Sequence, residues 1–520
     1  MKNYLKYLPF LALGVISCEP ELDNPIDEPG FYTNGEADFS NYVALGNSLT
    51  AGYADGALYI TGQENSYPNI LAQQFSLAQE TSDFKQPLMS DNVGGLLLAG
   101  NQITSNRRVL AVGANGAPAP KIYAGTSTTE ITNVLSGPFN NMGVPGAKSF
   151  HLLAPGYGDV TGLAVGTANP YFVRFASSPG TSVIADAVAQ NPTFFSLFIG
   201  NNDVLSYATS GGIGVDQTGN LNPATYGAND ITDPNVFASV YSQLVTSLVG
   251  TGADGVLMNI PDVTSVPFFT TVPNSALVLD AGTAASLTGY FQAVAEITTQ
   301  GLMAQGVPAA QAQALASQYA IKFNEGPNRF LIDVPVSQTN PLGFRQMTEK
   351  ELLVLTIDQG ALAQGYGSVK LSPEVMQVLG ILQTGGQPTP AQAQMVIDAV
   401  SGIDDKDALD SNELMLISNA TASYNATIKA LAQANGLAFL DTSALLTQVA
   451  NGGVAYDAGT VTSTFATGGA FSLDGVHPTP RGYALIANKI IDAVNKTYKS
   501  TVPKVNIGNY NTVTLSDNVQ

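Results

Sequence analysis

Four short blocks of this sequence carry residue types that together could perform nucleophilic chemistry at a serine. They are Gly46-Asn47-Ser48-Leu49, Gly143-Val144-Pro145-Gly146, Gly200-Asn201-Asn202-Asp203 and Asp474-Gly475-Val476-His477. A serine hydroxyl attacks an ester only with an adjacent base, a group that orients the base, and donors for the oxyanion. The four blocks contain a candidate for each of these roles.

The last block has the spacing of a catalytic base and its orienting acid. Asp474 and His477 lie three residues apart in a segment that contains a glycine. Such a turn can place the Asp474 carboxylate beside Nδ1 of the imidazole while Nε2 faces Ser48. We therefore expect Ser48 as nucleophile, His477 as general base and Asp474 as the acid that orients it.

The second and third blocks offer donors for an oxyanion. Asn202 can donate a side-chain N–H, and Gly146 presents a backbone N–H that no side chain obstructs. Glycine, asparagine and aspartate also favour ordinary turns, so the order of the blocks and the scarcity of histidine strengthen the interpretation. The chain has two histidines. We interpret the other, His151, as a packed or hydrogen-bonded loop residue, with lining of a cleft as the alternative.

Short apolar runs precede the blocks and predict the elements that position them. The runs cover residues 42–45, 194–199, 255–260 and 437–440. Continuous apolar runs of this length are typical of buried parallel strands, whose carboxyl ends carry ligand sites in open α/β sheets. Helices are expected over residues 410–435, with a capping box of Asp410 and Glu413, and over 480–496. Alternating strands and helices predict an α/β fold with a doubly wound parallel sheet.

Two stretches are too long to be simple connections between these elements. They cover residues 65–135 and 265–410, and the second contains helix-like segments at 309–320, 348–364 and 391–400. We interpret residues 265–410 as an inserted, mainly helical cap. Shaping substrate access and purely structural packing remain open as its role, and we expect the pocket that selects the substrate to lie in inserted segments.

The N-terminus predicts export. Lys2 and Lys6 flank an apolar run over residues 7–16 that is too short to span a bilayer, which is typical of a secretory signal over residues 1–18. Val15-Ile16-Ser17-Cys18 resembles the bacterial lipobox, which implies lipidation of Cys18, although an ordinary signal with an incidental cysteine is the alternative. Residues 19–38 are expected to form an acidic, flexible tether, similar to export signals of surface lipoproteins in Bacteroidetes. We expect an extracytoplasmic, lipid-anchored protein at the outer membrane or cell surface.

Composition narrows the remaining possibilities. The chain of 520 residues is 45% hydrophobic and 12% charged, so it can form a large core. A formal charge of −20 argues against a nucleic-acid partner, and a single cysteine allows no intramolecular disulfide. The acidic cluster Asp404, Asp405, Asp407 and Asp410 lacks the spacing of a calcium loop and is interpreted as a solvated helix start. We expect no metal and no cofactor, and a C-terminal tail over residues 501–520. Phe268 and Phe269 are expected in the core, and the alternative for these two residues is that they line an acyl pocket.

The ordered blocks resemble the SGNH, or GDSL-type, hydrolase superfamily of esterases, lipases and carbohydrate deacylases. The resemblance covers residues 46–477 and implies a three-layer flavodoxin-like fold over residues 39–500. It further implies Ser48 as nucleophile, an oxyanion hole formed by the backbone N–H of Ser48 with Gly146 and Asn202, His477 as base and Asp474 as its partner. One residue departs from the family name, because Asn47 stands where an aspartate is implied. Thr50 rules out the Gly-x-Ser-x-Gly elbow of another large class of serine hydrolases.

The expected activity is therefore hydrolysis of a carboxylic ester through an acyl-enzyme, with a lipid, a short acyl ester or an acylated glycan as substrate. The alternative is a non-catalytic surface lipoprotein that binds glycan or lipid on the same scaffold.

Overall fold

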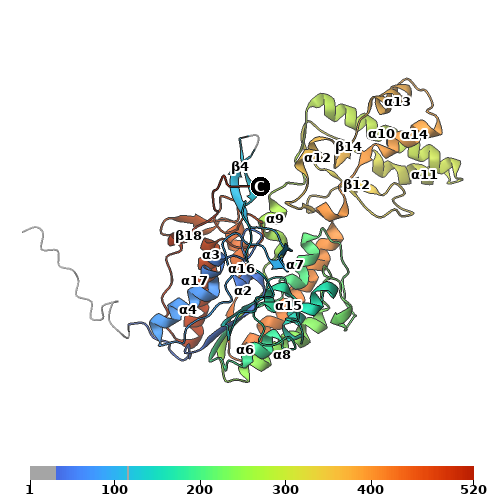
Figure 1. Cartoon of the computed structure of the whole chain (residues 1–520). Helices are drawn as coiled ribbons and strands as arrows, with labels where there is room; N and C mark the ends of the chain where they lie inside the picture. The colour runs from blue at the N-terminus through green and yellow to red at the C-terminus, as the bar shows by residue number, and fades with distance from the viewer. Residues whose placement is uncertain (1–30, 114–115) are drawn as a thin grey trace, which may run out of the picture.

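The computed structural model describes residues 31–113 and 116–520 (Figure 1). The predicted signal segment with Cys18, and residues 19–30 of the expected tether, lie outside this range. Within it, no helix combines the length and hydropathy needed to cross a membrane.

Five parallel strands form the central sheet, in the order β6-β1-β7-β8-β17. Their bounds are β6 Asn141–Gly143, β1 Tyr42–Gly46, β7 Phe194–Phe198, β8 Asp254–Met258 and β17 Ala438–Leu440. Numbered along the chain this is the order 2-1-3-4-5, in which the direction of winding reverses between β1 and β7. The α/β class and four of the strands were predicted correctly. The short strand β6 was not, because it holds a single large apolar residue, Met142.

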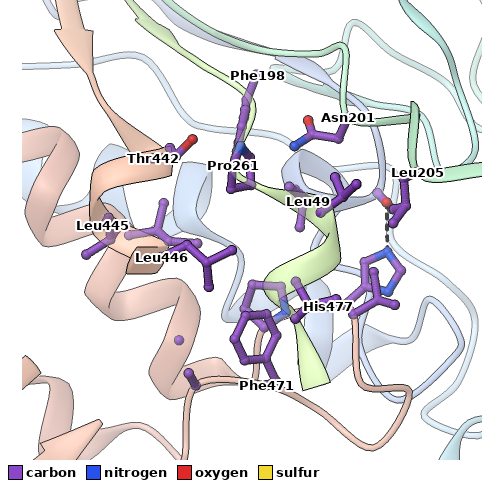
Figure 2. Close-up of a pocket in the computed structure, with 18 of the residues that line it drawn as sticks. Leu49, Phe198, Asn201, Leu205, Pro261, Thr442, Leu445, Leu446, Phe471 and His477 are labelled. Atoms are coloured by element: carbon purple, nitrogen blue, oxygen red, sulfur yellow. Dashed lines mark hydrogen bonds between the residues drawn. The ribbon is translucent and has the colours of Figure 1, made fainter. Parts of the chain in front are cut away.

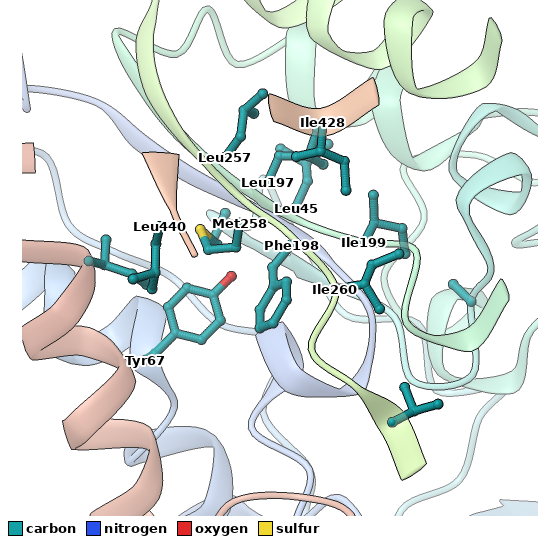
Figure 3. Close-up of a cluster of buried hydrophobic side chains, with 14 of the residues drawn as sticks. Leu45, Tyr67, Leu197, Phe198, Ile199, Leu257, Met258, Ile260, Ile428 and Leu440 are labelled. Atoms are coloured by element: carbon teal, nitrogen blue, oxygen red, sulfur yellow. The ribbon is translucent and has the colours of Figure 1, made fainter. Parts of the chain in front are cut away.

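Helices cover both faces of this sheet (Figure 1). On one face α4 (Tyr67–Ala78) packs against α17 (Pro480–Tyr498), and on the other α15 (Ser411–Ala434) packs against α8 (Pro234–Val249), with α6 (Val183–Val188) beside it. Both predicted helices, now α15 and α17, are confirmed. Figure 3 shows the side chains buried in this core, among them Leu45, Leu197, Phe198 and Met258.

Helix α15 begins as the sequence predicted. Asp410 Oδ1 accepts hydrogen bonds from the backbone N–H groups of Asn412 and Glu413. In turn, the Glu413 carboxylate accepts a hydrogen bond from the backbone N–H of Asp410. This reciprocal bonding satisfies N–H groups that have no partner inside the helix. Asp410 of the acidic cluster is thus a helix cap, while Asp404 pairs with Lys406.

The body also contains shorter elements around the sheet. These are α2 Ser48–Ala51, α3 Ile60–Glu64, β2 Leu97–Leu98, β3 Asn101–Gln102, β4 Arg108–Val112, β5 Pro118–Ile122, α5 Pro170–Val173, α7 Asn202–Thr209, α9 Pro267–Thr270, α16 Thr442–Ala450, β18 Val454–Tyr456 and β19 Gly459–Val461. Strands β4 and β5 form an antiparallel hairpin, along which the C-terminal tail runs through bonds such as Leu110 N–H to Thr514 O (2.8 Å).

The segment between α9 and α15 forms a lobe that projects from the body (Figure 1). It has a hydrophobic core of its own, built around Leu287, Phe291 and Val294 of its longest helix. Its elements are β9 Leu277–Leu279, α10 Ala281–Ala304, α11 Ala309–Ala316, β10 Gly326–Asn328, β11 Leu331–Asp333, β12 Phe344–Gln346, β13 Leu352–Leu353, α12 Gln359–Ala363, β14 Ser368–Val369, α13 Pro373–Gln383, α14 Pro390–Asp398, β15 Val400–Ser401 and β16 Ala408–Leu409. Helices provide most of its regular structure, as predicted.

One predicted helix of the lobe is wrong. Helices at 309–320 and 391–400 are confirmed as α11 and α14, but most of 348–364 is not helical. Glu351 is fully buried and pairs with both terminal nitrogens of Arg345, while its carboxylate also accepts the N–H of Thr348 and that of Ser411. These bonds fold the backbone into a turn, and the next residues pair with β16. Tertiary contacts therefore override the helical propensity of this stretch.

The body begins earlier than residue 39. The N–H of Glu36 donates to the carbonyl of Tyr498 (2.6 Å), and the N–H of Thr501 donates to the carbonyl of Thr33 (2.9 Å). Ala37 is buried. The prediction of a flexible tether is therefore wrong for residues 33–38, which pack against the end of α17.

Candidate active site

Ser48 lies at the carboxyl edge of the sheet, two residues beyond β1. The turn after β1 leaves no room for a side chain at Gly46, since a Cβ there would stand 2.1 Å from Thr50 Oγ1 and 2.4 Å from the carbonyl oxygen of Phe198. Asn47 then caps α2, since its Oδ1 accepts the N–H of Leu49 at 3.0 Å. Gly46 thus allows β7 to approach closely, and the cap of Asn47 directs Ser48 into the first turn of α2.

The structure brings the three predicted triad residues into one chain of hydrogen bonds. His477 Nε2 lies 2.8 Å from Ser48 Oγ (dashed line at His477 in Figure 2), and His477 Nδ1 lies 2.8 Å from Asp474 Oδ2. An ionised carboxylate can only accept, so the proton of the neutral imidazole belongs on Nδ1. Nε2 is then free to accept the hydroxyl proton of Ser48, which is the arrangement of a nucleophile with its base.

The carboxylate of Asp474 is held by several donors. Oδ1 accepts the N–H groups of Val476 (2.9 Å) and His477 (2.8 Å), and Oδ2 accepts the N–H of Gly56 (2.9 Å). The hydroxyl of Ser472 also donates to Oδ1. Burial by itself raises the pKa of Asp474, but the neighbouring His477 and these donors outweigh it and hold the pKa well below its usual range. Asp474 therefore stays ionised and fixed in orientation.

A turn at Asp55 and Gly56 supports this carboxylate and was not predicted as part of the site. The N–H of Asp55 donates to Ser472 Oγ (2.9 Å), and Asp55 Oδ1 accepts the N–H of Leu473 (3.0 Å). Tyr59 donates its hydroxyl to Asp55 Oδ2 at 2.8 Å. The only signal in the sequence is the turn-forming pair Asp-Gly, because residues 55 and 474 meet only in the folded chain.

Helix α9, which forms the base of the projecting lobe, also supports this loop. The N–H of Phe268 donates to the carbonyl of Gly475 at 2.9 Å. Gly475 has φ +75°, and a Cβ there would stand 2.9 Å from Leu355 Cδ2 and 3.0 Å from the nitrogen of Phe268. Phe268 and Phe269 are both buried in the core, which confirms the interpretation of these two phenylalanines as core residues.

Asn202 and Gly146 lie at the same sheet edge as Ser48. Asn202 begins α7 directly after β7, and Gly146 follows β6, the strand on the other side of β1. Asn202 Nδ2 donates one hydrogen bond to the carbonyl of Ala147 (2.9 Å), which links it to the turn that contains Gly146. An amide nitrogen carries two hydrogens, so Asn202 retains a second donor. Gly146 has φ +81° and an exposed backbone, so its N–H is not shielded by a side chain.

Asp203, in the third block, binds the segment that follows the second block. Its buried carboxylate accepts the N–H of Ser149 (2.8 Å) and the hydroxyl of the same residue (2.7 Å). Burial raises the pKa of Asp203. Asn47, which stands where the family name implies an aspartate, links the first and third blocks, because its Nδ2 donates to Asn201 Oδ1 at 3.3 Å. An aspartate at position 47 would have no hydrogen to donate there.

An apolar pocket adjoins Ser48 and His477 (Figure 2). Its cavity volume is about 110 Å³. The lining residues are Asn47, Ser48, Leu49, Phe198, Asn201, Asn202, Leu205, Pro261, Val263, Val266, Thr442, Leu445, Leu446, Val449, Ala470, Phe471, Val476, His477, Pro478, Gly482, Leu485 and Ile486. Of these, only Val266 belongs to the segment 265–410. The body, and not the inserted segment, therefore forms the apolar pocket beside Ser48, whereas we expected the pocket that selects the substrate to lie in inserted segments.

His151 is packed away from the triad, which confirms its interpretation as a hydrogen-bonded loop residue. Its Nδ1 accepts the N–H of Lys148 (3.0 Å), and its ring stacks on Tyr157 with centroids 4.7 Å apart. Burial, with a smaller contribution from the charge of Lys148, lowers its pKa to about 4. His151 therefore stays neutral under mildly acidic conditions.

Among residues 31–113 and 116–520, no group of three or more His, Cys, Asp or Glu side chains is arranged to hold a metal ion. The acidic residues near α15 have other partners, such as the hydroxyl of Tyr366 on Asp407 at 2.7 Å.

Comparisons with known proteins give no further guide. No protein-family model, curated protein or solved structure matches this chain. Its function must be inferred from the residues and contacts described above.

The buried histidine predicts a pH-dependent loss of stability. As pH falls from 7.5 to 5, His151 of the unfolded chain takes up a proton near its ordinary pKa of 6.5, whereas the folded chain resists protonation down to about 4. The unfolded state then binds more protons, so stability falls with pH, by on the order of 1–2 kcal/mol at pH 5. In His151→Gln, whose amide oxygen can still accept the N–H of Lys148, the drop should be smaller. Urea unfolding of both proteins at the two pH values measures this, and an equal drop would contradict it.

Proposed function

We propose that this protein is a serine esterase of the SGNH type that hydrolyses carboxylic esters through an acyl-enzyme. The observation that carries the proposal is the pair of 2.8 Å contacts that joins Ser48 to His477 and His477 to Asp474, beside an apolar pocket. Support for the finer fold assignment, a three-layer flavodoxin-like sheet, comes from the strand order and from helices on both faces.

In the first half of the reaction, Ser48 Oγ attacks the carbonyl carbon of the ester. His477 Nε2 takes the hydroxyl proton, and the Asp474 carboxylate stabilises the imidazolium that forms. The negative charge on the carbonyl oxygen is met by N–H donors, for which we propose the backbone of Ser48 and Gly146 and the free N–H of Asn202. His477 then returns the proton to the leaving alcohol, and the acyl group stays on Ser48.

In the second half, a water molecule replaces the alcohol. His477 removes a proton from this water as it attacks the acyl-enzyme, and the same donors stabilise the second oxyanion. Collapse of the intermediate returns the proton to Ser48 Oγ and releases the carboxylic acid. No metal or organic cofactor takes part in this scheme.

We further propose that the enzyme acts outside the cytoplasm, held to a membrane by lipid on Cys18. The charged start, short apolar run and lipobox-like end of residues 1–18 support this part of the proposal. The alternative of a non-catalytic lipid- or glycan-binding lipoprotein is separated from it by the reactivity of Ser48.

Loss of the nucleophile is the primary test. Ser48→Ala should lower hydrolysis of p-nitrophenyl acetate to background, because no acyl-enzyme can form, and should abolish labelling by a fluorophosphonate probe. The circular dichroism spectrum and melting temperature report whether the variant is folded. Wild-type protein that is folded, unlabelled and inactive would favour the non-catalytic binding role.

The oxyanion donor is tested separately. Asn202→Ala should reduce kcat by about 10² to 10³ with little change in KM, because the lost N–H acts mainly in the transition state. Steady-state kinetics on p-nitrophenyl acetate measure this. Asn419→Ala is the control, because Asn419 is exposed on α15 and does not line the pocket, and its kcat should match that of the wild type. An unchanged kcat in Asn202→Ala would exclude this residue as a donor.

The pH profile tests the base. The proposed scheme requires a neutral His477, since a protonated imidazole cannot accept a proton from Ser48. Asp474, with its pKa held well below the usual range, stays ionised, and His151 stays neutral down to about pH 4, so neither should cause a loss of kcat/KM above that pH. His151→Gln should therefore keep the acidic limb of the wild type. If the acidic limb moves in this variant, His151 and not the proposed base causes the loss of activity.

A further inference from the structure

The pocket beside Ser48 is lined almost wholly by apolar side chains once it leaves the catalytic edge. Its polar lining residues are Asn47, Ser48, Asn201, Asn202 and His477, which belong to the site itself, and Thr442. The hydroxyl of Thr442 is already bonded to the carbonyl oxygen of Asn259. A sugar placed here would lose its hydrogen bonds to water without replacement, at a cost of about 1–3 kcal/mol for each buried hydroxyl. An alkyl chain has no such cost.

Helices α16 and α17 contribute much of the apolar wall of the pocket. Leu445, Leu446 and Val449 come from α16, and Leu485 and Ile486 come from α17. Figure 2 shows Leu445 and Leu446 on the side of the pocket opposite His477, with Pro261 between. A linear substituent on the carbonyl carbon at Ser48 would therefore extend toward α16.

The volume of the pocket limits the length of that substituent. A water-sized group occupies about 30 Å³ in a liquid, so a cavity of about 110 Å³ holds roughly four such groups. A methylene group is close to a water molecule in size. The pocket therefore suits a chain of about four carbons.

The order of the chemical steps indicates which side of the ester this pocket holds. The acyl group remains bonded to Ser48 through both halves of the reaction, whereas the alcohol must leave and water must reach the same carbonyl carbon. The side of the alcohol must therefore open to solvent. A pocket walled by two helices of the body suits the group that stays.

We propose that this pocket binds the acyl chain, and that the substrates are esters of straight-chain carboxylic acids of about four carbons. The proposal rests on the esterase function proposed above. Leu445, half-buried at the far end, sets the length of chain that fits.

The test is a series of p-nitrophenyl esters from acetyl to palmitoyl with the protein lacking its first 18 residues. Each methylene that enters the pocket should raise kcat/KM about 3- to 4-fold up to about butanoyl, after which the rise should stop. Methyl butanoate should be hydrolysed faster than butyl acetate. The reverse order would assign the pocket to the alcohol and overturn the proposal.

Variants on α16 locate the effect. Leu445→Trp should lower the ratio of butanoyl to acetyl ester kcat/KM at least tenfold, because the larger side chain fills the end of the pocket at α16. Leu445→Ala should shift the preference to longer chains. Gln448→Trp is the matched control, because Gln448 is exposed on the same helix and does not line the pocket, and it should match the wild type on every ester.

The two proposals fail in different ways. Hydrolysis of acetyl ester with no gain on longer chains, or with no effect of Leu445→Trp on chain length, would overturn the acyl pocket and leave the esterase standing. Absence of hydrolysis of every ester together with absence of probe labelling would overturn the esterase, and the acyl pocket with it.

Discussion

The site depends on one long-range contact, the hydrogen bond between Ser48 Oγ and His477 Nε2, whose residues are 429 positions apart in the chain. Ser48 follows strand β1, while His477 stands on a loop just before α17. Each must be held to within a few tenths of an ångström, because proton transfer requires hydrogen-bond distance. Most of the surrounding structure can be understood as support for these two positions.

The sheet supports Ser48 and the proposed oxyanion donors together. Gly46 is in register with Gly143 on β6 and with Phe198 on β7, so the three strands end at the same edge. Ser48, Gly146 and Asn202 each follow one of these strands within a few residues. The reversal of winding between β1 and β7 leaves the crevice in which such sheets bind ligands. Asp203 and Asn202 then bind the turn after β6 through Ser149 and Ala147.

His477 depends instead on contacts that the sheet does not supply. Asp474 receives donors from its own loop and from Gly56, and the carbonyl of Gly475 receives the N–H of Phe268 at the base of the projecting lobe. The lobe has its own core, and apart from Val266 the segment 265–410 does not line the apolar pocket. Its base therefore acts on the site as a support for the histidine loop, while α16 and α17 of the body form the pocket.

The sequence by itself determined the candidate triad, the α/β class and most of the sheet, because these depend on local patterns. Ser48, His477 and Asp474 stand in short blocks, the strands are apolar runs that end at those blocks, and Asp410 with Glu413 is a local capping pattern. Strand β6 was not predicted, because a three-residue strand with one large apolar side chain has no apolar run or alternation that would indicate a strand. The wrong helix at 348–364 has the opposite cause, since its composition favours a helix but the buried Glu351 and the pairing with β16 do not. Only the tertiary structure decided that the Asp55 turn supports Asp474, that the lobe does not line the pocket, and that α16 and α17 do. Each of these depends on which distant segments meet in the folded chain, and no local pattern of residues records that.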